Sequence, residues 1–390
     1  MTLESQRLLD LYAGTLLRIL LKPAAWLLSG VLQRRHDLGN CRSLTFLKLH
    51  GGGSLAIAYP ALLGLRRTAQ VRELRIVTTP AVEPFARVLG VFDEILVIRD
   101  RGWLELAASA ARAIGRLFRC DSVIDLEIHS RLGTVFSLLT CARNRIGSYT
   151  SDSSRHTSLS THVLFCNPSG KVYEFYDQVA HLFGAVVPGM AECTRILRHS
   201  LGLPEARGAT ECAAVGLAPT CSALRKERML RPAEWVEIVK RKIDERGPAA
   251  VEFHLLGGEF ERARLDELAG MLRAVIPGVR VKNQAGGRPL AERLREVAQL
   301  REVVCVDSAM LHFARLLGTP VTSYWGPSDP ETLLRPAAGS TDEIHYEKIS
   351  CSPCVYATRV APCRGNNVCM RLACNPQAQV DRNPTWTRGA

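Results

Sequence analysis

Short apolar runs alternate with longer amphipathic stretches along most of the chain from residue 43 onward. Apolar runs of this length are typical of buried β-strands, and the stretches between them have the spacing of helices. In the first half, the pattern predicts strands at 44–50, 73–78, 94–98 and 122–126, with helices at 55–65, 82–89 and 103–118. Strands that alternate with helices in this way predict a parallel, doubly wound sheet.

The pattern restarts in the second half, after a glycine- and proline-containing stretch at about 184–210 that we interpret as a linker. One further strand is predicted to end near Leu217, and others lie at 251–256, 303–306 and 321–325. Helices are predicted to start at Pro232, to span 264–274 and to surround His312. We therefore expect an α/β protein with two Rossmann-like, doubly wound domains. The expected divisions are a helical segment at 1–42, domains at 43–190 and 210–350, and a cysteine-rich segment at 351–390.

The N-terminal segment carries an apolar stretch, 8–32, which is interrupted by three charged residues, Asp10, Arg18 and Lys22. Because it contains no uninterrupted apolar run of about 20 residues, we do not expect a transmembrane helix. The stretch is also untypical of a signal peptide, since the side chains before it carry no surplus of positive charge, with Glu4 balancing Arg7, and no small-residue cleavage site follows. Two interpretations stay open: a helical pair packed on the protein, or an interfacial helix that places leucines, Tyr12 and Trp26 at an anionic membrane.

The composition limits the class of partner. With 390 residues, of which 47% are hydrophobic, the chain is long enough for two ordinary domains and too apolar to be disordered. Its formal net charge of +12 indicates an anionic partner, such as a nucleotide sugar, a phosphorylated lipid or a membrane surface. A general surplus of surface cations is the alternative. Nucleic acid is not expected, because aromatic residues make up only 6% and the sequence shows no nucleic-acid-binding motif.

The thirteen cysteines are unevenly distributed. Those before residue 306 are scattered singly, several in apolar contexts typical of buried reduced thiols, which favours a cytoplasmic chain over a disulfide framework. The others form the pattern Cys351-x2-Cys354-x8-Cys363-x5-Cys369-x4-Cys374. Four thiolates that begin with Cys-x-x-Cys can hold structural zinc or iron. The candidate ligands are Cys351, Cys354, Cys363 and Cys369, and reduced structural thiols are the alternative.

The segment 303–336 combines the features of a ligand-binding strand–turn–helix unit. A buried strand is followed by a turn at Asp307-Ser308 and by a helix that carries His312. Gly318-Thr319-Pro320 ends this helix, and a second strand runs into Gly326-Pro327-Ser328. The N-terminus of such a helix presents free N–H groups and a partial positive charge to phosphates. An ordinary buried crossover with a capping Asp is the alternative.

This segment resembles the donor-binding segment of glycosyltransferase family nine, the lipopolysaccharide heptosyltransferases. The residues that match the family pattern are Asp307, Ser308, His312, Ala314, Gly318, Pro320, Gly326, Pro327 and Ser328, and Ala309 replaces the family's glycine. The resemblance covers roughly 43–375, most closely in the second half. It implies the GT-B architecture, in which two Rossmann-like domains face a ligand cleft, with Asp307, Ser308, Ala309 and His312 at the donor.

The resemblance also implies a position for the catalytic base. In the family, a Gly-Asp pair opens the helix after the first strand, and the Asp deprotonates the acceptor. The aligned residues here are Gly53 and Ser54. A serine hydroxyl cannot serve as a simple carboxylate-like base, so Ser54 marks an altered catalytic position. The alternative bases are His50, Asp125, Glu127 and His129.

Further donor contacts are implied in the second half. Lys226 and Arg228 precede Pro232, as in the family's Lys-Arg-Trp-Pro region, whose Lys contacts donor phosphate, although the spacing indicates a small insertion. A solvated run of charges is the alternative for both. Gly257 follows a predicted strand and is expected to face the nucleoside, and Gly53 is expected to let the backbone approach the ligand.

These features predict a glycosyltransferase that moves a heptose or related sugar from a nucleotide diphosphate donor of the ADP-heptose type to a lipopolysaccharide or other glycan acceptor. No catalytic cofactor is expected, because a helix dipole and cations can stabilise the leaving diphosphate. We expect a cytoplasmic protein that docks peripherally on the inner face of the membrane. The alternatives are a relative that binds a nucleotide sugar without transferring it, in view of Ser54 and Ala309, and a nucleotide-sugar epimerase of similar two-domain fold.

Overall fold

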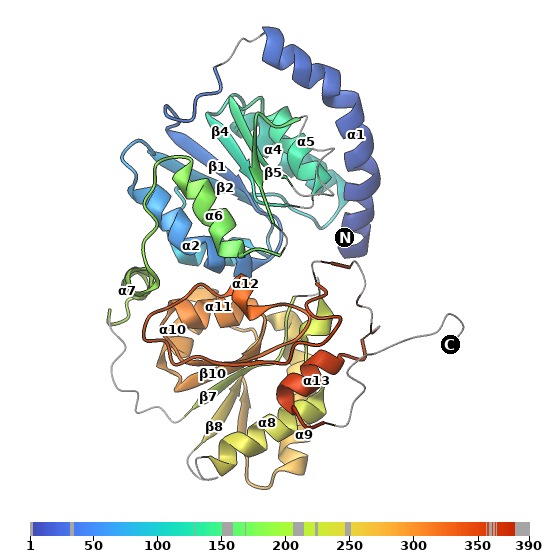
Figure 1. Cartoon of the computed structure of the whole chain (residues 1–390), viewed down its shortest axis with the longest axis vertical. Coiled ribbons are helices and arrows are strands. Elements are labelled where there is room, and N and C mark those ends of the chain that lie inside the picture. Colours follow the sequence, from blue (N-terminus) through green and yellow to red (C-terminus); the bar gives the residue numbers. More distant parts are fainter. Residues whose placement is uncertain are drawn as a thin grey trace, which may run out of the picture. The chain divides into compact units, whose positions relative to one another are not determined.

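The computed structural model of the protein describes residues 3–31, 35–128, 130–149, 159–167, 169–205, 214–222, 225–245, 251–355, 357–358, 361, 363 and 365–378. The chain divides into two compact units, Met1–Gly189 and Met190–Ala390. Each unit has its own sheet with helices on both faces (Figure 1). In the described residues each sheet has six strands, and all neighbouring strands run parallel.

The N-terminal sheet has the order β3-β2-β1-β4-β5-β6. Its strands are β1 (Ser43–Leu47), β2 (Glu73–Thr78), β3 (Glu94–Val97), β4 (Ser122–Asp125), β5 (Asn144–Tyr149) and β6 (His162–Phe165). The helices are α1 (Leu3–Val31), α2 (Gly52–Arg67), α3 (Glu83–Leu89), α4 (Trp103–Arg116), α5 (Arg131–Leu139) and α6 (Val172–His181). The central strands β1 and β4 are buried almost throughout, as expected for a parallel sheet that helices cover on both faces.

The C-terminal sheet has the equivalent order β9-β8-β7-β10-β11-β12. Its strands are β7 (Val215–Ala218), β8 (Glu252–Leu255), β9 (Arg280–Asn283), β10 (Glu302–Val306), β11 (Val321–Trp325) and β12 (Glu343–Tyr346). The helices are α7 (Met190–Ser200), α8 (Pro232–Asp244), α9 (Arg262–Val275), α10 (Leu290–Gln299), α11 (Ala309–Leu316), α12 (Pro330–Leu333) and α13 (Val368–Cys374). In both sheets the order reverses between the first and fourth strands, and ligands of such sheets bind at this point, beyond the carboxyl ends of the strands.

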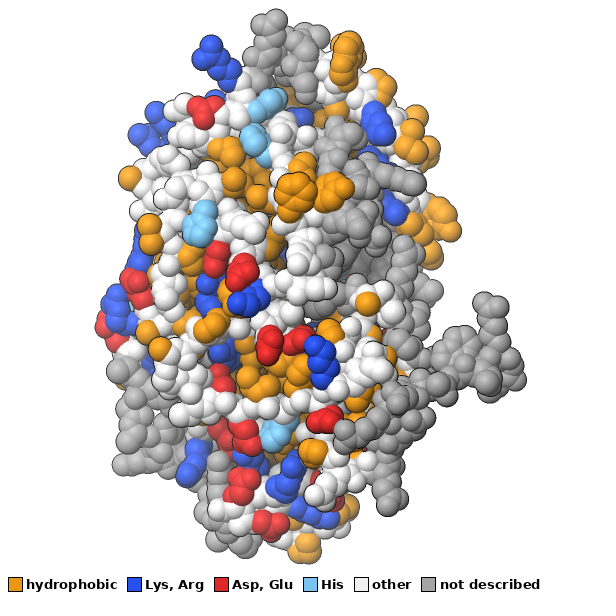
Figure 2. Space-filling view, in the orientation of Figure 1, with side chains coloured by type: hydrophobic (Ala, Val, Ile, Leu, Met, Phe, Trp, Pro, Cys, Tyr) orange, Lys and Arg blue, Asp and Glu red, His pale blue; other side chains and the backbone are white. Residues whose placement is uncertain are grey.

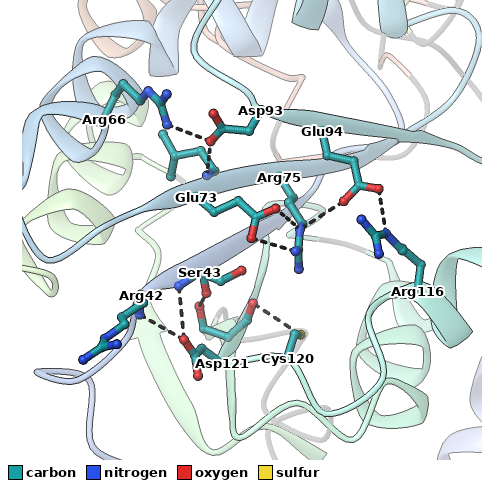
Figure 3. A network of polar contacts seen from close by, with 12 residues as sticks. Arg42, Ser43, Arg66, Glu73, Arg75, Asp93, Glu94, Arg116, Cys120 and Asp121 are labelled. Carbon is teal, nitrogen blue, oxygen red and sulfur yellow. Dashed lines mark hydrogen bonds and ion pairs between the residues drawn. The ribbon is translucent and has the colours of Figure 1, made fainter.

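The opposite, amino-terminal edge of the first sheet is held by a network of ion pairs (Figure 3). Arg75 lies between two carboxylates, with contacts of 2.6 Å to Glu73 and 3.1 Å to Glu94. Asp121 accepts hydrogen bonds from two backbone N–H groups at the start of β1. These contacts join the beginnings of neighbouring strands, so this edge has a structural role.

The α/β class and both Rossmann-like sheets predicted from sequence are confirmed, but two segments differ from the prediction. The stretch interpreted as a linker, 184–210, contains α7, whose Cys193 and Leu197 are fully buried where the helix packs near α11. The polar stretch 150–170, in which the hydrophobic pattern predicts no strand, contains the edge strand β6. Both elements are short, and an edge strand is only partly buried, so neither leaves a long hydrophobic pattern.

The N-terminal segment forms one helix, α1, and not a helical pair. Pro23 lies inside this helix without ending it, and Ala25 on the far side of the proline packs with Val135 and Leu138. Contact with α5 therefore holds both halves of α1 on this unit, although the helix bends along its length (Figure 1). Within the described residues, none of the helices combines the length and apolar character that crossing a membrane requires.

Candidate functional site

The segments that follow β7 and β10 meet at the carboxyl edge of the C-terminal sheet, because these two strands are neighbours. Asp307 directly follows β10 and is only 4% exposed. Its Oδ2 accepts hydrogen bonds from Arg228 Nη1 at 3.1 Å and from Ser328 Oγ at 2.7 Å. The sequence motif contains Ser328 without assigning it a role, and the structure shows that it helps to hold Asp307.

Asp307 is held in its ionised form by these neighbours. Burial alone would raise the pKa of the carboxyl group, but the charge of Arg228 and the contacts with His312 and Ser328 outweigh burial, and the pKa lies well below its usual range. His312 Nε2 lies 3.7 Å from Asp307 Oδ1, and His312 is itself buried. We call Asp307, Arg228, His312 and Ser328 the Asp307 cluster.

Ser308 is the N-cap residue of α11. Its backbone is extended, with φ of −150° and ψ of 171°, as an N-cap requires, but its side chain makes no capping hydrogen bond. The Ser308 Oγ is buried and has no hydrogen-bond partner among the described residues. The first N–H groups of any α-helix also lack intrahelical acceptors. This helix start therefore presents several donors to an acceptor that the protein does not supply, an arrangement that suits a phosphate.

The predicted donor residues Lys226 and Arg228 lie in one 3-10 turn, Lys226–Arg228. Besides its bond to Asp307, Arg228 donates to Ser222 Oγ at 3.0 Å. Lys226 is exposed to solvent. Arg228 is therefore part of the buried cluster, and Lys226 remains available on the surface of the same turn.

The other two arginines of this loop have structural roles. Arg225 donates to the backbone carbonyls of Val355 and Thr358, which ties the loop to the cysteine-rich segment. Arg231 pairs with Glu234 in the first turn of α8. A run of four cations in the sequence thus divides into one side chain at the cluster, one exposed side chain and two that hold the fold.

Gly257 and Ala309 also lie in this unit, as predicted. Gly257 follows β8, and its carbonyl accepts a hydrogen bond from Gly286 N at 3.0 Å. A Cβ at Gly257 would lie 2.7 Å from Leu265 Cδ1, so the packing of α9 is itself a reason for glycine here. Ala309 is the first residue of α11 and is half-buried.

The N-terminal unit has a polar cluster at its own switch point, because β1 and β4 are neighbours. Lys48 Nζ lies 3.1 Å from Glu127 Oε1. The same oxygen accepts hydrogen bonds from the backbone N–H groups of Leu49 at 2.7 Å and His50 at 2.8 Å. Glu127, one of the alternative bases, is therefore engaged in tying the loop after β1 to the end of β4.

Asp125 occupies the last position of β4 and is buried. Burial raises the pKa of this carboxyl group well above its usual range, although a hydrogen bond from the backbone N–H of Glu127 opposes the shift. Asp125 is therefore a neutral acid over a wider pH range than an exposed carboxyl. His129, another alternative base, lies outside the described residues.

Ser54 and Gly53 lie in the first turn of α2. The turn is entered through Gly51, whose φ of +79° is in the left-handed region that favours glycine. Burial raises the pKa of the Tyr176 hydroxyl, and a hydrogen bond with Ser54 opposes this shift. Ser54 thus lies beside a buried phenol that sequence reasoning did not identify.

The four predicted cysteine ligands, Cys351, Cys354, Cys363 and Cys369, line one small pocket beside α13. Burial raises the pKa of the thiols of Cys351, Cys354 and Cys369, the last to about 12. In the part of the chain that the structure describes, no group of three or more His, Cys, Asp or Glu side chains is arranged to hold a metal ion. Structural zinc or iron at these cysteines stays a prediction, which the metal content of the purified protein would test.

The part of the chain that contains this site is similar to a known protein family. Residues 209–364 match the model of glycosyltransferase family 9 (heptosyltransferase). This region is a glycosyltransferase family 9 domain. The family resemblance inferred from the sequence is thereby confirmed, and the matched range contains the whole Asp307 cluster, Ser308 and Gly257. A comparison with curated proteins found no match.

Solved structures of this family share the fold of both units. The glycosyltransferase family 9 protein of Veillonella parvula DSM 2008 is 16% identical, with a TM-score of 0.57 over 80% of this chain and 87% of that chain. The ADP-heptose lps heptosyltransferase II of E. coli is 16% identical, with a TM-score of 0.56 over 78% and 92%. E. coli heptosyltransferase WaaC with ADP is 15% identical, with a TM-score of 0.59 over 77% and 93%. The GT-B class predicted from the sequence is thereby confirmed.

Proposed function

We propose that the protein transfers a heptose or related sugar from a nucleotide diphosphate donor to a lipopolysaccharide or other glycan acceptor. The family 9 domain supports transferase activity. The observation that carries the donor assignment is the buried, unbonded hydroxyl of Ser308 at the start of α11, next to the cation of Arg228. The E. coli structures of similar fold contain ADP or an ADP-heptose analogue, which supports a donor of the ADP-heptose type.

In this proposal the donor diphosphate binds at the N-terminus of α11. The first N–H groups of the helix, the Ser308 hydroxyl and Arg228 donate to its oxygens, and His312 adds a further donor. When the bond between the sugar C1 and the phosphate oxygen breaks, negative charge grows on the leaving diphosphate. Donors that are already fixed in position stabilise that charge without a metal ion. Asp307 keeps Arg228 and His312 in place.

On the acceptor side, we propose that Ser54 helps to position the hydroxyl that attacks C1. The new bond forms between this oxygen and C1, and the proton of the acceptor passes to a base other than Ser54. A glycolipid acceptor would place the enzyme on the cytoplasmic face of a membrane, as the sequence-based expectation has it.

The test is an assay with ADP-heptose, UDP-hexoses and GDP-hexoses, each with and without a lipopolysaccharide-core acceptor, in which glycan products and released nucleotide diphosphate are measured. We expect transfer that requires the acceptor. Donor binding without transfer would instead identify a relative that has lost its chemistry. An isomerised sugar formed without acceptor would identify an epimerase.

A further inference from the structure

Helix α1 carries most of its large apolar side chains on the side that faces away from α5. Most are more than half exposed, including Tyr12 at 70% and Trp26 at 78%. They are spaced mostly by three or four residues and so fall within an arc of about 120° around the helix, at 100° per residue. We call this surface the α1 stripe, and its members are Leu8, Tyr12, Leu16, Ile19, Leu20, Trp26 and Leu27.

The inner face of α1 is held largely by polar and small residues, with Leu21 packed beside Ala25. Asp10 accepts hydrogen bonds from Ser130 Oγ at 2.7 Å and from the backbone N–H of Arg131 at 2.9 Å, at the start of α5. Gly14 lies so close to Arg131 that a Cβ would come within 2.8 Å of its side chain. An ordinary surface helix packs its apolar face inward. Because α1 is held by its polar and small residues, its apolar face is left for something outside the unit.

The stripe is visible on the surface. In Figure 2 hydrophobic side chains recur along the upper right edge of the molecule, where Figure 1 draws α1. Contiguous exposed apolar surface of this kind marks sites of contact with proteins or membranes.

The charges and aromatic rings of α1 favour a lipid surface. Between Leu8 and Leu27 the charged residues are Asp10, Arg18 and Lys22. Asp10 is engaged by α5 and Arg18 is buried, which leaves Lys22 as the exposed charge of this stretch. Tyrosine and tryptophan are enriched where a bilayer meets water, and cations near them attract anionic headgroups. No exposed acid in this stretch opposes such contact.

Pro23 argues against a second copy of the chain as the occupant. A proline has no N–H, so the carbonyl of Ile19, four residues earlier in the helix, loses its intrahelical hydrogen bond. The exposed Pro23 lies on the same side as the stripe. A dry helix–helix interface would bury this carbonyl without a partner, whereas the hydrated headgroup level of a bilayer keeps it bonded to water.

We propose that the α1 stripe docks the protein on an anionic bilayer, with the helix parallel to the surface and its apolar side chains among the headgroups. The helix is already folded against α5, so docking does not have to order it. The evidence for this docking surface comes from the side chains of α1 alone. Its purpose, to bring the enzyme to a lipid-linked acceptor, rests on the proposed function.

The test is co-sedimentation of the full-length protein with vesicles of phosphatidylcholine containing phosphatidylglycerol, and with phosphatidylcholine alone. We expect stronger binding to the anionic vesicles. The variant Leu16→Gln/Leu20→Gln/Trp26→Gln should bind them at least a hundredfold more weakly, since one large apolar side chain contributes about tenfold to membrane affinity. Lys22→Glu should weaken binding to anionic vesicles and leave the weak binding to phosphatidylcholine unchanged.

A matched control is Leu104→Gln/Phe118→Gln/Val186→Gln, which removes three exposed apolar side chains of the same unit outside α1. It should bind vesicles like the unsubstituted protein. The proposal is overturned if the unsubstituted protein does not sediment with anionic vesicles, or if the α1 variant binds as well as the control. It is also overturned if light scattering shows a lipid-free dimer that the α1 variant converts to monomers. ADP binding, measured on each variant, distinguishes a failure of the docking proposal from a failure of the transferase proposal.

Discussion

The N-terminal and C-terminal sheets have the same strand order, and in each the fourth strand leads into a helix at the switch point. In the N-terminal unit this helix is α5, and its first N–H groups are bonded to the carboxylate of Asp10 from α1. In the C-terminal unit it is α11, where the hydroxyl of Ser308 has no partner among the described residues. An acidic side chain already occupies the anion position in one unit, whereas in the other we propose that the donor diphosphate takes this position.

The ion pairs beside these two helices also differ in what surrounds them. Glu127 pairs with Lys48, but its oxygen is also taken by two backbone N–H groups of the loop after β1. Asp307 pairs with Arg228 at the same distance of 3.1 Å, and this pair lies next to the open start of α11. One topology thus supports a loop held by hydrogen bonds in the first unit and the proposed anion site in the second.

The largest expected effect is a difference in stability between variants of two buried aspartates, Asp307 and Asp125. We expect Asp307→Asn to lower the free energy of unfolding at pH 7 by about 3 kcal/mol, because it leaves the largely buried charge of Arg228 without its partner. Asp125→Asn should preserve or raise stability at the same pH, since the folded state disfavours the ionised form of Asp125. Urea unfolding monitored by circular dichroism checks both.

The pH dependence of stability sharpens this contrast. The folded-state pKa of Asp307 is lowered, so its contribution is present above the unfolded pKa of about 4 and is lost as the pH falls toward the folded value. The folded-state pKa of Asp125 is raised, so its contribution is greatest below about pH 4 and declines as the pH rises. In each Asn variant, the pH dependence of stability that the replaced aspartate contributes should disappear. Equal slopes in both variants would contradict the assignment.

His312→Ala should weaken nucleotide diphosphate binding by about 1–3 kcal/mol, the cost of losing one hydrogen bond to a charged group. His254 of β8 is a matched control, because it lies in the same unit and is largely shielded from solvent, but bonds to Glu252 and Gln284. His254→Ala should leave the affinity within experimental error. Calorimetric titration with ADP, UDP and GDP measures both, and identical affinities of the two variants would remove His312 from the site.

Ser54→Ala should lower turnover modestly, by about tenfold for each 1.4 kcal/mol of transition-state stabilisation that is lost. Donor affinity should stay unchanged, because the hydroxyl belongs to the acceptor side in our proposal. Ser54→Asp is expected to raise activity toward a heptose-type acceptor. Complete loss of activity in Ser54→Ala, with donor affinity intact, would show that Ser54 itself carries an essential step.

The smallest expected effect concerns the occupied helix start of the N-terminal unit. Asp10→Ala should lower stability by about 1 kcal/mol, as expected for the loss of a helix-capping side chain. Nucleotide affinity should not change, which a titration beside the thermal unfolding curve would show. A stronger affinity for ADP would mean that α5 can also receive phosphate.

That Asp307, Ser308 and His312 lie together was predictable, because they are close in the sequence. Asp307, Ser308 and His312 fall within one strand–turn–helix unit, whose apolar strand and helix-stopping glycine are local signals. Arg228 lies 79 residues away and was suggested by the family resemblance.

Other parts of both clusters depend on contacts that leave no local pattern. Asp10 reaches the start of α5 across 121 residues, and Tyr176 reaches Ser54 from another helix. The basic loop reads as one run of charge, so the different partners of Arg225, Arg228 and Arg231 could not be separated before the fold was known. Polar contacts between distant segments have no periodicity to detect, unlike the burial of strands.

The most direct measurement is calorimetric titration of ADP, UDP and GDP into Arg228→Gln, with Arg231→Gln as control. Both variants remove one cation from the same loop, but Arg231 pairs with Glu234 and Arg228 with the Asp307 cluster. We predict at least tenfold weaker binding for Arg228→Gln, equivalent to about 1.4 kcal/mol, and unchanged binding for Arg231→Gln. Unchanged binding by Arg228→Gln would contradict a phosphate site at the start of α11.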